Sequence, residues 1–410
     1  MRYDIIIVGG GVGGCALAAR MAGAGHTVLV LEREADYQDR VRGEGLVNWG
    51  YEQAVEMGLG ETVRRAPGAS AISRLVNYDE TLPTHVAQKL AKDLSAVLPG
   101  TPGILGVGHP ELRRALADAA TAAGATVRFG VSQAVVEAGE RPSVRYRTAT
   151  GPSCQDEARL VVVADGKNSA TRRALGIDLH VTRPRVMLTG LAVDDGGRWD
   201  RAETVIGVEG RNLFYVIPRG DGRIRLYLGR AVDDERFSGD GRERRFLDCF
   251  ALRSLPNHDC LVRARPVGPC ASFPMTDSWA DSVLVPGVAL IGDAAGWSNP
   301  VTGQGLAVAL RDARVLSDSL LAATSWSVGC LASYADERAE RMRRLRFASA
   351  LTDLLAAFGA PERQRRRQRM FAALRSHPEL GIALEAVHAG PWRVPAAGFS
   401  PDILTTLALA

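Results

Sequence analysis

The chain has 410 residues, 46% of them hydrophobic and 23% charged, which is the composition of a folded globular protein and excludes a disordered chain or a fibrous repeat. Its length exceeds that of one typical compact domain and predicts two or three domains. The formal charge of +4 is too small to indicate a polyanionic partner.

The cysteines, histidines and apolar runs narrow the class of protein further. The six cysteines include no C-x-x-C pair, and the seven histidines are not at metal-binding spacing. The N-terminal residues do not read as a secretion signal, and no segment approaches the roughly 20 apolar residues of a membrane span. We therefore expect a cytoplasmic protein with no membrane segment and no metal site.

The first predicted elements form one βαβ unit. Ile5–Val8 is a β-branched run that is interrupted by the glycine-rich segment 9–14. Cys15–Ala24 is rich in Ala and Leu and predicts a helix, and Thr27–Leu31 predicts a second strand that ends at Glu32. This order of strand, tight turn, helix and strand is the context that a dinucleotide-binding fingerprint requires.

The glycines of the tight turn have separate roles. Gly9 permits the sharp turn, Gly11 lets the backbone approach a pyrophosphate, and Gly14 lets the helix lie close to the strand. The helix start offers free N–H groups and a positive dipole to an anion. Glu32 is placed to accept the hydroxyls of an adenosine ribose, with Arg33 beside it as a further cofactor-binding candidate, and this acid favours FAD or NAD over NADP.

The middle of the chain predicts a second sheet. A helix is predicted over 110–123, and strands are predicted at 126–129, 143–148 and 160–164. Further strands are predicted at 186–193, 212–218 and 223–230, the last two joined by a hairpin turn. The α/β pattern returns at 287–291, and residues from Leu306 to about Val387 are mostly helical.

These patterns predict an α/β protein with a Rossmann-like FAD-binding domain, an inserted mixed β-sheet substrate domain and a helical C-terminus. The expected boundaries are as follows: FAD-binding domain 1–75, 105–180 and 265–345, substrate domain 76–104 and 181–264, and C-terminal helical region 346–410.

Two later motifs decide between FAD and NAD. Asp165–Arg172 follows an apolar strand, and Gly292–Gly296 follows another and precedes Pro300–Leu306. With these motifs the sequence resembles the class A flavoprotein monooxygenases, the family of para-hydroxybenzoate hydroxylase. The resemblance covers residues 1–75, 105–180 and 285–320.

The resemblance implies a role for each matching residue. Asp293 would hydrogen-bond a ribityl hydroxyl of FAD, and Pro300 would lie beside the working face of the flavin ring. The next helix would point its N–H groups at the pyrimidine edge of the flavin, where they stabilise negative charge. The cofactor-binding residues at this helix start are Gly303, Gly305, Leu306 and Ala307.

Three further positions leave two interpretations open. Asp165 would serve FAD and the nicotinamide cofactor, or it closes a local Asx turn. Arg42 would donate charge-assisted, bidentate hydrogen bonds to the FAD pyrophosphate, or it is a surface residue paired with Glu44. His109 stands where the family often has Arg or Gln, and it either contacts the flavin or only begins a helix.

The reaction chamber is expected between the flavin and one face of the inserted sheet. Phe214 and Tyr215 lie on opposite faces of the strand 212–218. Tyr215 would hydrogen-bond a phenolic substrate, or it is a packing residue of the strand. Trp297, Phe214 and Pro300 would form an apolar wall that excludes water.

The resemblance thus implies an FAD-dependent monooxygenase with NADH or NADPH as reductant. O2 would form a flavin C4a-hydroperoxide, and one oxygen atom would pass to a small, electron-rich substrate, aromatic or a secondary metabolite. A flavin-dependent halogenase is an alternative, although none of the six tryptophans stands in a W-x-W-x-I-P motif. A flavin-linked C=C reductase is another.

The arginine-rich stretches 338–346 and 363–369 raise a non-enzymatic alternative, an Arg-rich nucleic-acid-binding protein. The first stretch is interleaved with Glu, Leu and Met at helical spacing, as on a solvated helix face, and neither holds an aromatic residue for base stacking. We expect no nucleic-acid partner, and a monomer or homodimer.

Overall fold

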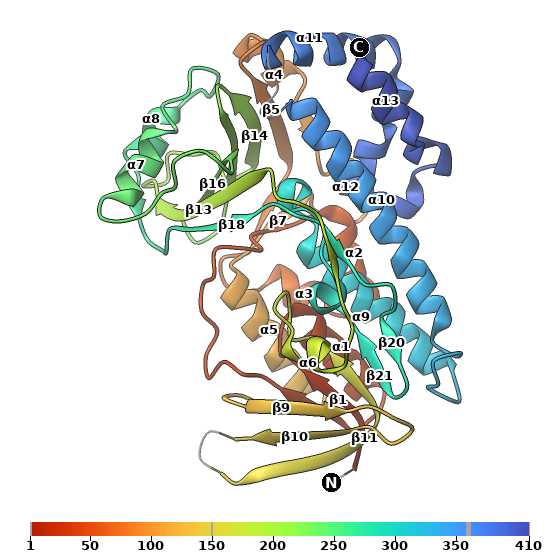
Figure 1. The fold of residues 1–410 in the computed structure, drawn as a ribbon. Helices are drawn as coiled ribbons and strands as arrows, with labels where there is room; N and C mark the ends of the chain where they lie inside the picture. Colours follow the sequence, from red (N-terminus) through yellow and green to blue (C-terminus); the bar gives the residue numbers. More distant parts are fainter. Residues whose placement is uncertain (1, 149–150, 358–361, 410) are drawn as a thin grey trace.

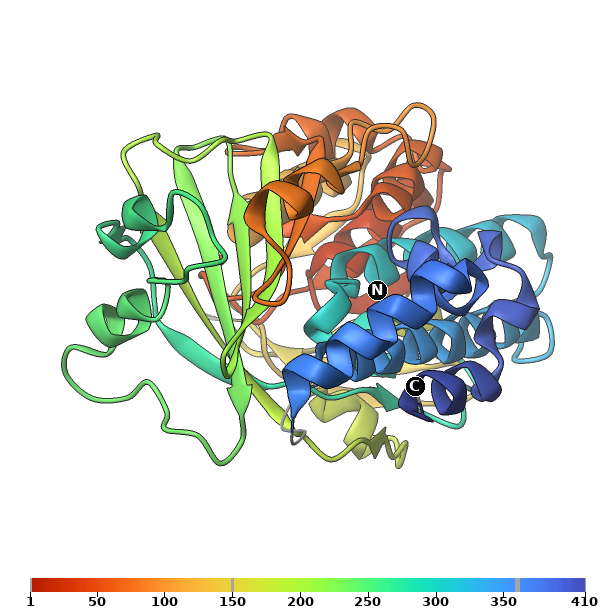
Figure 2. The ribbon, with the colours of Figure 1, turned by 90° about the horizontal axis from the view of Figure 1, so that it is seen from above.

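The protein consists of two sheet-containing bodies with a group of helices along one side. The computed structural model describes residues 2–148, 151–357 and 362–409. In Figure 1 one sheet lies at the bottom and the other at the upper left, and the long helix α10 (Ala332–Ala356) runs past both. Seen from above, the second sheet (green) and the C-terminal helices (blue) lie on opposite sides of the molecule (Figure 2).

The lower sheet has eight strands, in the order β20-β21-β11-β1-β2-β8, with β10 and β9 continuing from β11. Strands β21, β11, β1, β2 and β8 are parallel, so their carboxyl ends lie at one edge. The strands are β1 (Arg2–Val8), β2 (Val28–Leu31), β8 (Thr126–Arg128), β9 (Ser132–Glu137), β10 (Ser143–Arg147), β11 (Ser153–Val163), β20 (Leu284–Val285) and β21 (Val288–Leu290).

Helices and a small sheet surround this lower sheet. Helix α1 packs against α5 and α9, and α2 packs against α9. The elements are α1 (Val12–Gly23), α2 (Asn48–Glu56), α3 (Gly60–Arg64), α5 (His109–Ala122), α6 (Ala170–Ala174), α9 (Gly305–Ala322), η1 (Gly292–Ala295), η2 (Pro300–Thr302) and the three-stranded sheet β3 (Gly45–Leu46), β4 (Ser70–Ile72) and β7 (Ile104–Gly106).

The upper sheet also has eight strands and is mixed, because β5 runs parallel to β14 while the other neighbours are antiparallel. Its order is β17-β13-β16-β15-β14-β5-β6, with β18 also on β13. The elements are β5 (Arg74–Asp79), β6 (Lys92–Asp93), β13 (Val186–Asp194), β14 (Glu203–Glu209), β15 (Asn212–Pro218), β16 (Arg223–Ala231), β17 (Arg265–Pro266), β18 (Ala271–Pro274), α4 (Thr84–Lys89), α7 (Arg242–Asp248) and α8 (His258–Val262).

Alternation along β15 gives this upper sheet two different faces. Phe214 packs in the core cluster that contains Phe246 of α7 and Leu261 of α8, on the outer face. Tyr215 packs in a second cluster with Val301, on the inner face toward the lower body. The expectation that Phe214 belongs to the chamber wall is therefore wrong, because its side chain points to the other side of the sheet.

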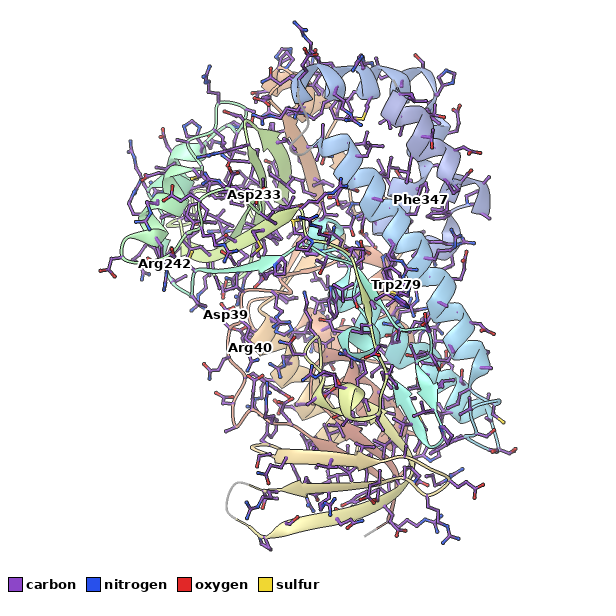
Figure 3. The ribbon with its side chains drawn as sticks, viewed as in Figure 1. Asp39, Arg40, Asp233, Arg242, Trp279 and Phe347 are labelled. Atoms are coloured by element: carbon purple, nitrogen blue, oxygen red, sulfur yellow. The ribbon has the colours of Figure 1, made fainter. Side chains whose placement is uncertain are left out.

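Two short strands connect the bodies. β12 (His180–Val181) pairs antiparallel with β19 (Ser278–Trp279), and each continues into the upper sheet. Trp279 also lies beside α10 (Figure 3), where the Arg346 guanidinium stacks on its ring at 4.6 Å. The crossing strands and α10 are thus in contact.

The C-terminal region adds helices with a core of their own, which includes Leu351 and Phe399. These elements are α11 (Arg363–Ser376), η3 (Pro378–Glu385), α12 (Ala386–Ala389), η4 (Pro391–Arg393), η5 (Ala396–Phe399) and α13 (Pro401–Leu409). Within residues 2–148, 151–357 and 362–409, no helix combines the length and the apolar character that a bilayer crossing demands.

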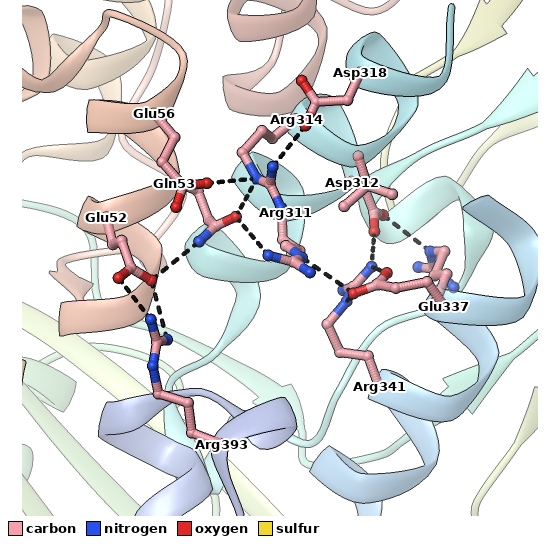
Figure 4. Close-up of polar contacts among 12 residues, drawn as sticks. Glu52, Gln53, Glu56, Arg311, Asp312, Arg314, Asp318, Glu337, Arg341 and Arg393 are labelled. Carbon is pink, nitrogen blue, oxygen red and sulfur yellow. Dashed lines mark hydrogen bonds and ion pairs between the residues drawn. The ribbon is translucent and has the colours of Figure 1, made fainter. Parts of the chain in front are cut away.

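A polar network joins this region to the lower body (Figure 4). Arg393 of η4 pairs with Glu52 of α2 at 2.7 Å. Gln53, also on α2, accepts hydrogen bonds from Arg311 and Arg314 of α9, at 3.0 and 2.7 Å. Arg311 also pairs with Glu337 of α10 at 3.0 Å (Figure 4), so α2, α9, α10 and η4 are tied together on one side of the molecule.

Candidate active site

Four predicted residues meet at the carboxyl edge of the lower sheet. Gly9 follows β1, Glu32 follows β2, Asp165 follows β11 and Asp293 follows β21. Because these strands are parallel neighbours, residues up to 284 positions apart in the sequence, 9 to 293, are gathered along one edge. This edge is where ligands bind in open α/β sheets.

The glycine-rich turn has the geometry that its sequence predicts. Gly9 has φ +110°, and a Cβ there would lie 2.4 Å from the carbonyl oxygen of Ala164. A Cβ at Gly14 would lie 2.1 Å from the carbonyl oxygen of Gly9. A Cβ at Gly11 would face open space, at the start of α1. Gly9 and Gly14 thus allow close packing, and Gly11 leaves room for a ligand at a helix N-terminus.

Glu32 is held by the turn and by an arginine that sequence analysis missed. Its carboxylate accepts hydrogen bonds from the N–H of Gly10 and the N–H of Glu34, both at 2.8 Å. The Arg113 guanidinium of α5 lies 3.4 Å from it. A carboxylate has capacity for about four hydrogen bonds, so Glu32 can still accept one from a ribose. Arg33 is exposed.

Asp293 is an acceptor without a partner. It is half-buried, and among the residues that the structure describes none donates a hydrogen bond to its carboxylate. Burial raises the pKa of Asp293, and the nearby charges of Arg42 and Lys167 oppose that shift. Arg42 is exposed, and its expected partner Glu44 pairs instead with Arg225 at 2.9 Å.

The turn that carries Asp293 is fixed by a buried arginine. Arg338 of α10 donates hydrogen bonds to the carbonyl oxygens of Gly292, Ala295 and Gly296, at 3.0, 3.0 and 2.9 Å. Its Nε also donates to Asp312 of α9 at 2.9 Å. Every carbonyl in this set belongs to the Gly292–Gly296 motif, so Arg338 sets the shape of the turn.

This role corrects the interpretation of the first arginine-rich stretch, 338–346, as a solvated helix face. Arg338 and Arg341 are each only 3% exposed, and Arg367 in the second stretch is 0% exposed. Each lies against carboxylates from other elements, Asp312 for the first two and Asp79 for Arg367. Helical spacing in the sequence could not show these partners, which come from α9 and β5.

The start of α9 also points into open space. Gly303 has φ +65°, and a Cβ at Gly305 would meet nothing within 4 Å. The first backbone N–H groups of α9 have no acceptor inside the helix, and these belong to Gly305, Leu306 and Ala307. Trp49 of α2 donates from Nε1 to the side-chain oxygen of Gln304 at 2.9 Å and so holds the residue before the helix.

Two more polar atoms near this edge have no protein partner. Asp165 accepts a hydrogen bond from the N–H of Thr171 at 3.2 Å, but its buried Oδ1 has no partner among the described residues. The same holds for Nδ1 of His109, which is half-buried in the first turn of α5. Burial lowers the pKa of His109 to about 3, so the imidazole is neutral.

Taken with Gly11, Gly305 and Asp293, these atoms meet the requirements of a bound nucleotide. The free acceptors suit hydroxyls, the helix starts suit a pyrophosphate and an electron-rich ring edge, and the glycines leave space. The residues present therefore fit FAD.

The expected chamber residues surround the turn Pro300–Thr302. Tyr215 donates its hydroxyl to the carbonyl oxygen of Val301 at 3.0 Å, and burial raises the pKa of this tyrosine. Trp297 donates from Nε1 to Thr276 Oγ1 at 3.1 Å, and Lys167 lies over its ring at 4.3 Å. Tyr215 and Pro300 are thus brought to one place from the two bodies.

A buried ion cluster closes one side of this region. Arg225 of β16 pairs with Glu44 at 2.9 Å and with Asp39 at 2.6 Å. Tyr227 donates a short hydrogen bond to Glu44. Asp39, labelled in Figure 3, comes from the segment between the bodies. Sequence analysis missed this cluster because its members are up to 188 positions apart, 39 to 227, with no motif around Arg225.

Known proteins resemble this chain along most of its length. It is 28% identical over 323 residues to squalene epoxidase 2, mitochondrial, of Arabidopsis thaliana, covering 77% of this chain and 54% of that protein. It is 27% identical to the ubiquinone hydroxylase UbiL of Rhodospirillum rubrum over 400 residues, covering 92% and 87%. The chain thus spans little more than half the length of the squalene epoxidase.

The fold also matches a solved structure. The p-nitrophenol 4-monooxygenase PnpA of Pseudomonas putida has a TM-score of 0.79 at 19% identity, over 96% of this chain and 99% of that one. A family model described as FAD binding domain matches residues 2–348. Because that match spans most of the chain and the cradle fits the cofactor, the protein belongs to the FAD binding domain family.

Proposed function

We propose that this protein is an FAD-dependent monooxygenase that takes electrons from NADH or NADPH and inserts one oxygen atom from O2 into a small, electron-rich molecule. Membership of the FAD-binding family supports this proposal, as does the similarity to proteins named squalene epoxidase and ubiquinone hydroxylase. When bound, FAD would supply the ring that accepts hydride and reacts with O2.

The residues around the edge would hold that cofactor. Gly11 and the N-terminus of α1 would receive the pyrophosphate, with Arg42 as a neighbouring cation. Asp293 would accept a hydrogen bond from a ribityl hydroxyl, and the free N–H groups at Gly305 would face the electron-rich edge of the flavin.

The proposed substrate chamber rests on one observation. An apolar cluster lies between the inner face of the upper sheet and the turn Pro300–Thr302. Its buried members are Val41, Val186, Leu188, Leu213, Tyr215, Tyr227, Met275 and Val301. Both tyrosine hydroxyls already donate to protein oxygens, Tyr215 to Val301 and Tyr227 to Glu44. We therefore propose that the substrate is recognised by apolar contact and shape, which suits an alkene, a quinone or an aromatic ring.

The same cluster would protect the reaction. Apolar walls keep water away from reactive intermediates in the site and lower the local dielectric constant. Pro300 and the half-buried Trp297 would close the chamber from the side of the lower body.

The decisive experiment is a coupling assay with ¹⁸O2. The purified protein is loaded with FAD, and NADH and NADPH oxidation is followed with squalene, a ubiquinone-type quinone and simple phenols. We expect one compound to accelerate NAD(P)H oxidation and to gain one ¹⁸O atom per NAD(P)H. Saturation of a C=C bond without ¹⁸O would instead identify a reductase, and halide incorporation a halogenase. Failure to retain FAD would overturn the proposal.

A pair of matched variants tests the chamber. Leu213 belongs to the inner cluster, whereas Leu228 on the next strand belongs to the outer core, and both are almost fully buried. Leu213→Ala and Leu228→Ala should cost similar stability, about 2–5 kcal/mol. Only Leu213→Ala should change KM for the substrate, and equal KM values would place the chamber elsewhere.

We also propose that the protein works in the cytoplasm as a monomer or homodimer, without nucleic acid. All six cysteines are free thiols, which suits a reducing compartment. Size-exclusion chromatography with light scattering would measure the oligomeric state.

A further inference from the structure

Asn299, directly before Pro300, connects the turn of the chamber to two carboxyl groups. Its backbone N–H donates to Asp277 Oδ1 at 2.8 Å, and its side-chain amide donates to Asp353 Oδ2 at 3.2 Å. Its side-chain oxygen accepts the N–H of Val301 at 3.0 Å. One residue thus uses three groups to join two acids and the turn.

The turn is held from its other side as well. The Val301 carbonyl oxygen accepts the Tyr215 hydroxyl, and Thr302 Oγ1 lies 3.3 Å from Ser349 Oγ. Ser349 and Asp353 are one helical turn apart on α10, so both reach the turn from the same face of that helix. The position of the turn therefore depends on contacts with α10 and with the upper sheet.

The two acids come from different parts of the fold. Asp277 lies between β18 and β19, where the chain crosses between the bodies, and its N–H donates to Thr182 Oγ1 of the neighbouring crossing segment at 2.9 Å. Asp353 lies near the C-terminal end of α10. Asn299 bridges these two elements.

The surroundings favour a proton on this pair. Burial raises the pKa of Asp353 to about 7, with a further contribution from the charge of Asp277, and burial raises the pKa of Asp277 to about 6. Arg185 lies near Asp353 and Arg346 near Asp277, and both cations oppose these shifts. The Tyr215 hydroxyl is a further titratable neighbour, and the charge of Asp353 adds to the rise in its pKa.

We infer that Asp277 and Asp353 act together on the Pro300–Thr302 turn through Asn299, which donates to both acids and accepts the N–H of Val301. An ionised Asp353 binds the Asn299 amide more strongly than a neutral one, because charge-assisted hydrogen bonds are stronger. Two ionised carboxylates also repel each other, which favours keeping a proton on Asp353. The pair is thus a proton-linked positioning device for the turn, and its effect on the flavin rests on the proposed function.

The test is a pH titration of the FAD-loaded protein from pH 5 to 9. The flavin absorbance spectrum and the anaerobic rate of flavin reduction by NADH are recorded at each pH. We expect one transition with a midpoint between about pH 6 and 7, and we expect Asp353→Asn to abolish it. Asp277→Asn removes a like charge and should move the midpoint to lower pH.

Two variants serve as controls. Asp336 is exposed on the same helix, and Asp336→Asn removes an equal charge without touching the turn, so the transition should remain. Asp353→Glu retains a titrating carboxyl and should restore a transition, which also guards against a folding defect of the Asn variant. A transition that persists unchanged in Asp353→Asn, or is absent in the FAD-loaded wild type, would overturn the inference.

A second readout needs no cofactor and separates this inference from the proposed function. Acids with raised pKa values in the folded state bind protons more tightly than in the unfolded chain, so stability falls as pH rises from about 4 through 7. The acid pair therefore lowers the Tm of the FAD-free protein as pH rises from 5 to 8, while His388 contributes with the opposite sign. The Tm of the wild type relative to that of Asp353→Asn should therefore fall over this range. Loss of FAD binding with this Tm pattern intact would reject only the proposed function.

Discussion

Asp312 of α9 and Arg338 of α10 form a buried ion pair in which Asp312 Oδ2 lies 2.9 Å from Arg338 Nε. The same oxygen accepts the N–H of Gly292 at 2.7 Å, while Arg338 donates to the carbonyl oxygens of Gly292, Ala295 and Gly296. The pair thus holds both the donors and the acceptors of the turn that carries Asp293.

Arg338→Met should weaken both folding and cofactor binding. Removing one partner of a buried ion pair costs up to about 3–5 kcal/mol. Arg341 still pairs with Asp312 in this variant, so much of the loss comes from the three carbonyl groups that lose their donor. Urea unfolding should show that loss, and fluorescence titration should show weaker FAD binding. Arg343→Met is the matched control, because Arg343 is exposed on the same helix and its pair with Glu340 contributes less than about 1 kcal/mol. Equal effects of both variants would contradict this role.

The glycines of the first turn should separate binding from folding. Gly11→Ala places a methyl group in open space where the pyrophosphate would lie, so FAD affinity should fall about 10- to 100-fold with little change in apoprotein stability. Gly14→Ala should destabilise the apoprotein itself by about 1–3 kcal/mol, because the new Cβ meets the Gly9 carbonyl. Thermal unfolding of the apoprotein and FAD titration measure the two effects. Unaltered affinity in Gly11→Ala would argue against the assigned cradle.

Acid should destabilise the protein through a buried histidine of the C-terminal region. Burial lowers the pKa of His388 to about 3, and the charge of Lys92 adds to the shift. The unfolded chain takes up a proton near pH 6.5 and the folded chain does not, so stability is lost as pH falls from about 6.5 toward 3. At pH 5.5 the loss is about 1.4 kcal/mol.

His388→Gln should remove this part of the pH dependence. The free energy of unfolding, measured by urea at pH 7.5 and 5.5, should fall less in the variant than in the wild type. His377→Gln at an exposed position is the control and should retain the wild-type slope. The same slope in all three proteins would show that His388 is protonated in the folded state.

Arg225 should contribute strongly to the free energy of unfolding, because it pairs with Glu44 and Asp39 where the two bodies are in contact. Arg225→Met would leave Glu44, whose side chain is 1% exposed, without its cation, at a cost of about 3–5 kcal/mol. Glu44→Gln in the same chain should recover part of the loss, since it removes the unpaired charge. Arg223→Met, at a 47% exposed side chain of the same strand, should change the unfolding free energy by less than about 1 kcal/mol in urea. No recovery in the double variant would assign Arg225 a different role.

Local patterns predicted the strands and turns of the lower sheet well. The run Ile5–Val8 followed by glycines could only be a buried strand entering a tight turn, and β1 and α1 confirm this. The predicted strand at 160–164 is confirmed only as the buried end of β11, which begins at Ser153. Its first half alternates between exposed and buried residues and pairs antiparallel with β10, so it lacks the apolar run on which the prediction relied.

The contacts that complete the site could not be predicted, for a physical reason. Period-two alternation places Phe214 and Tyr215 on opposite faces of β15. Which of these faces packs against the lower body depends on the orientation of the whole upper sheet. Likewise, helical spacing assigns Arg338 to one face of α10, but it does not show that this face packs against Asp312 of α9. Such partners are fixed by packing between distant elements, and no local rule encodes them.

Helix α10 has a consequence for how the protein can move. Arg338 fixes the turn that carries Asp293, and Asp353, 15 residues later on the same helix, reaches the turn after Asn299. An α-helix rises about 1.5 Å per residue, so α10 alone spans the roughly 22 Å between these two contacts. A shift of α10 along its axis would displace both turns together, so the distance between the Asp293 turn and the Pro300–Thr302 turn should vary little when either sheet moves.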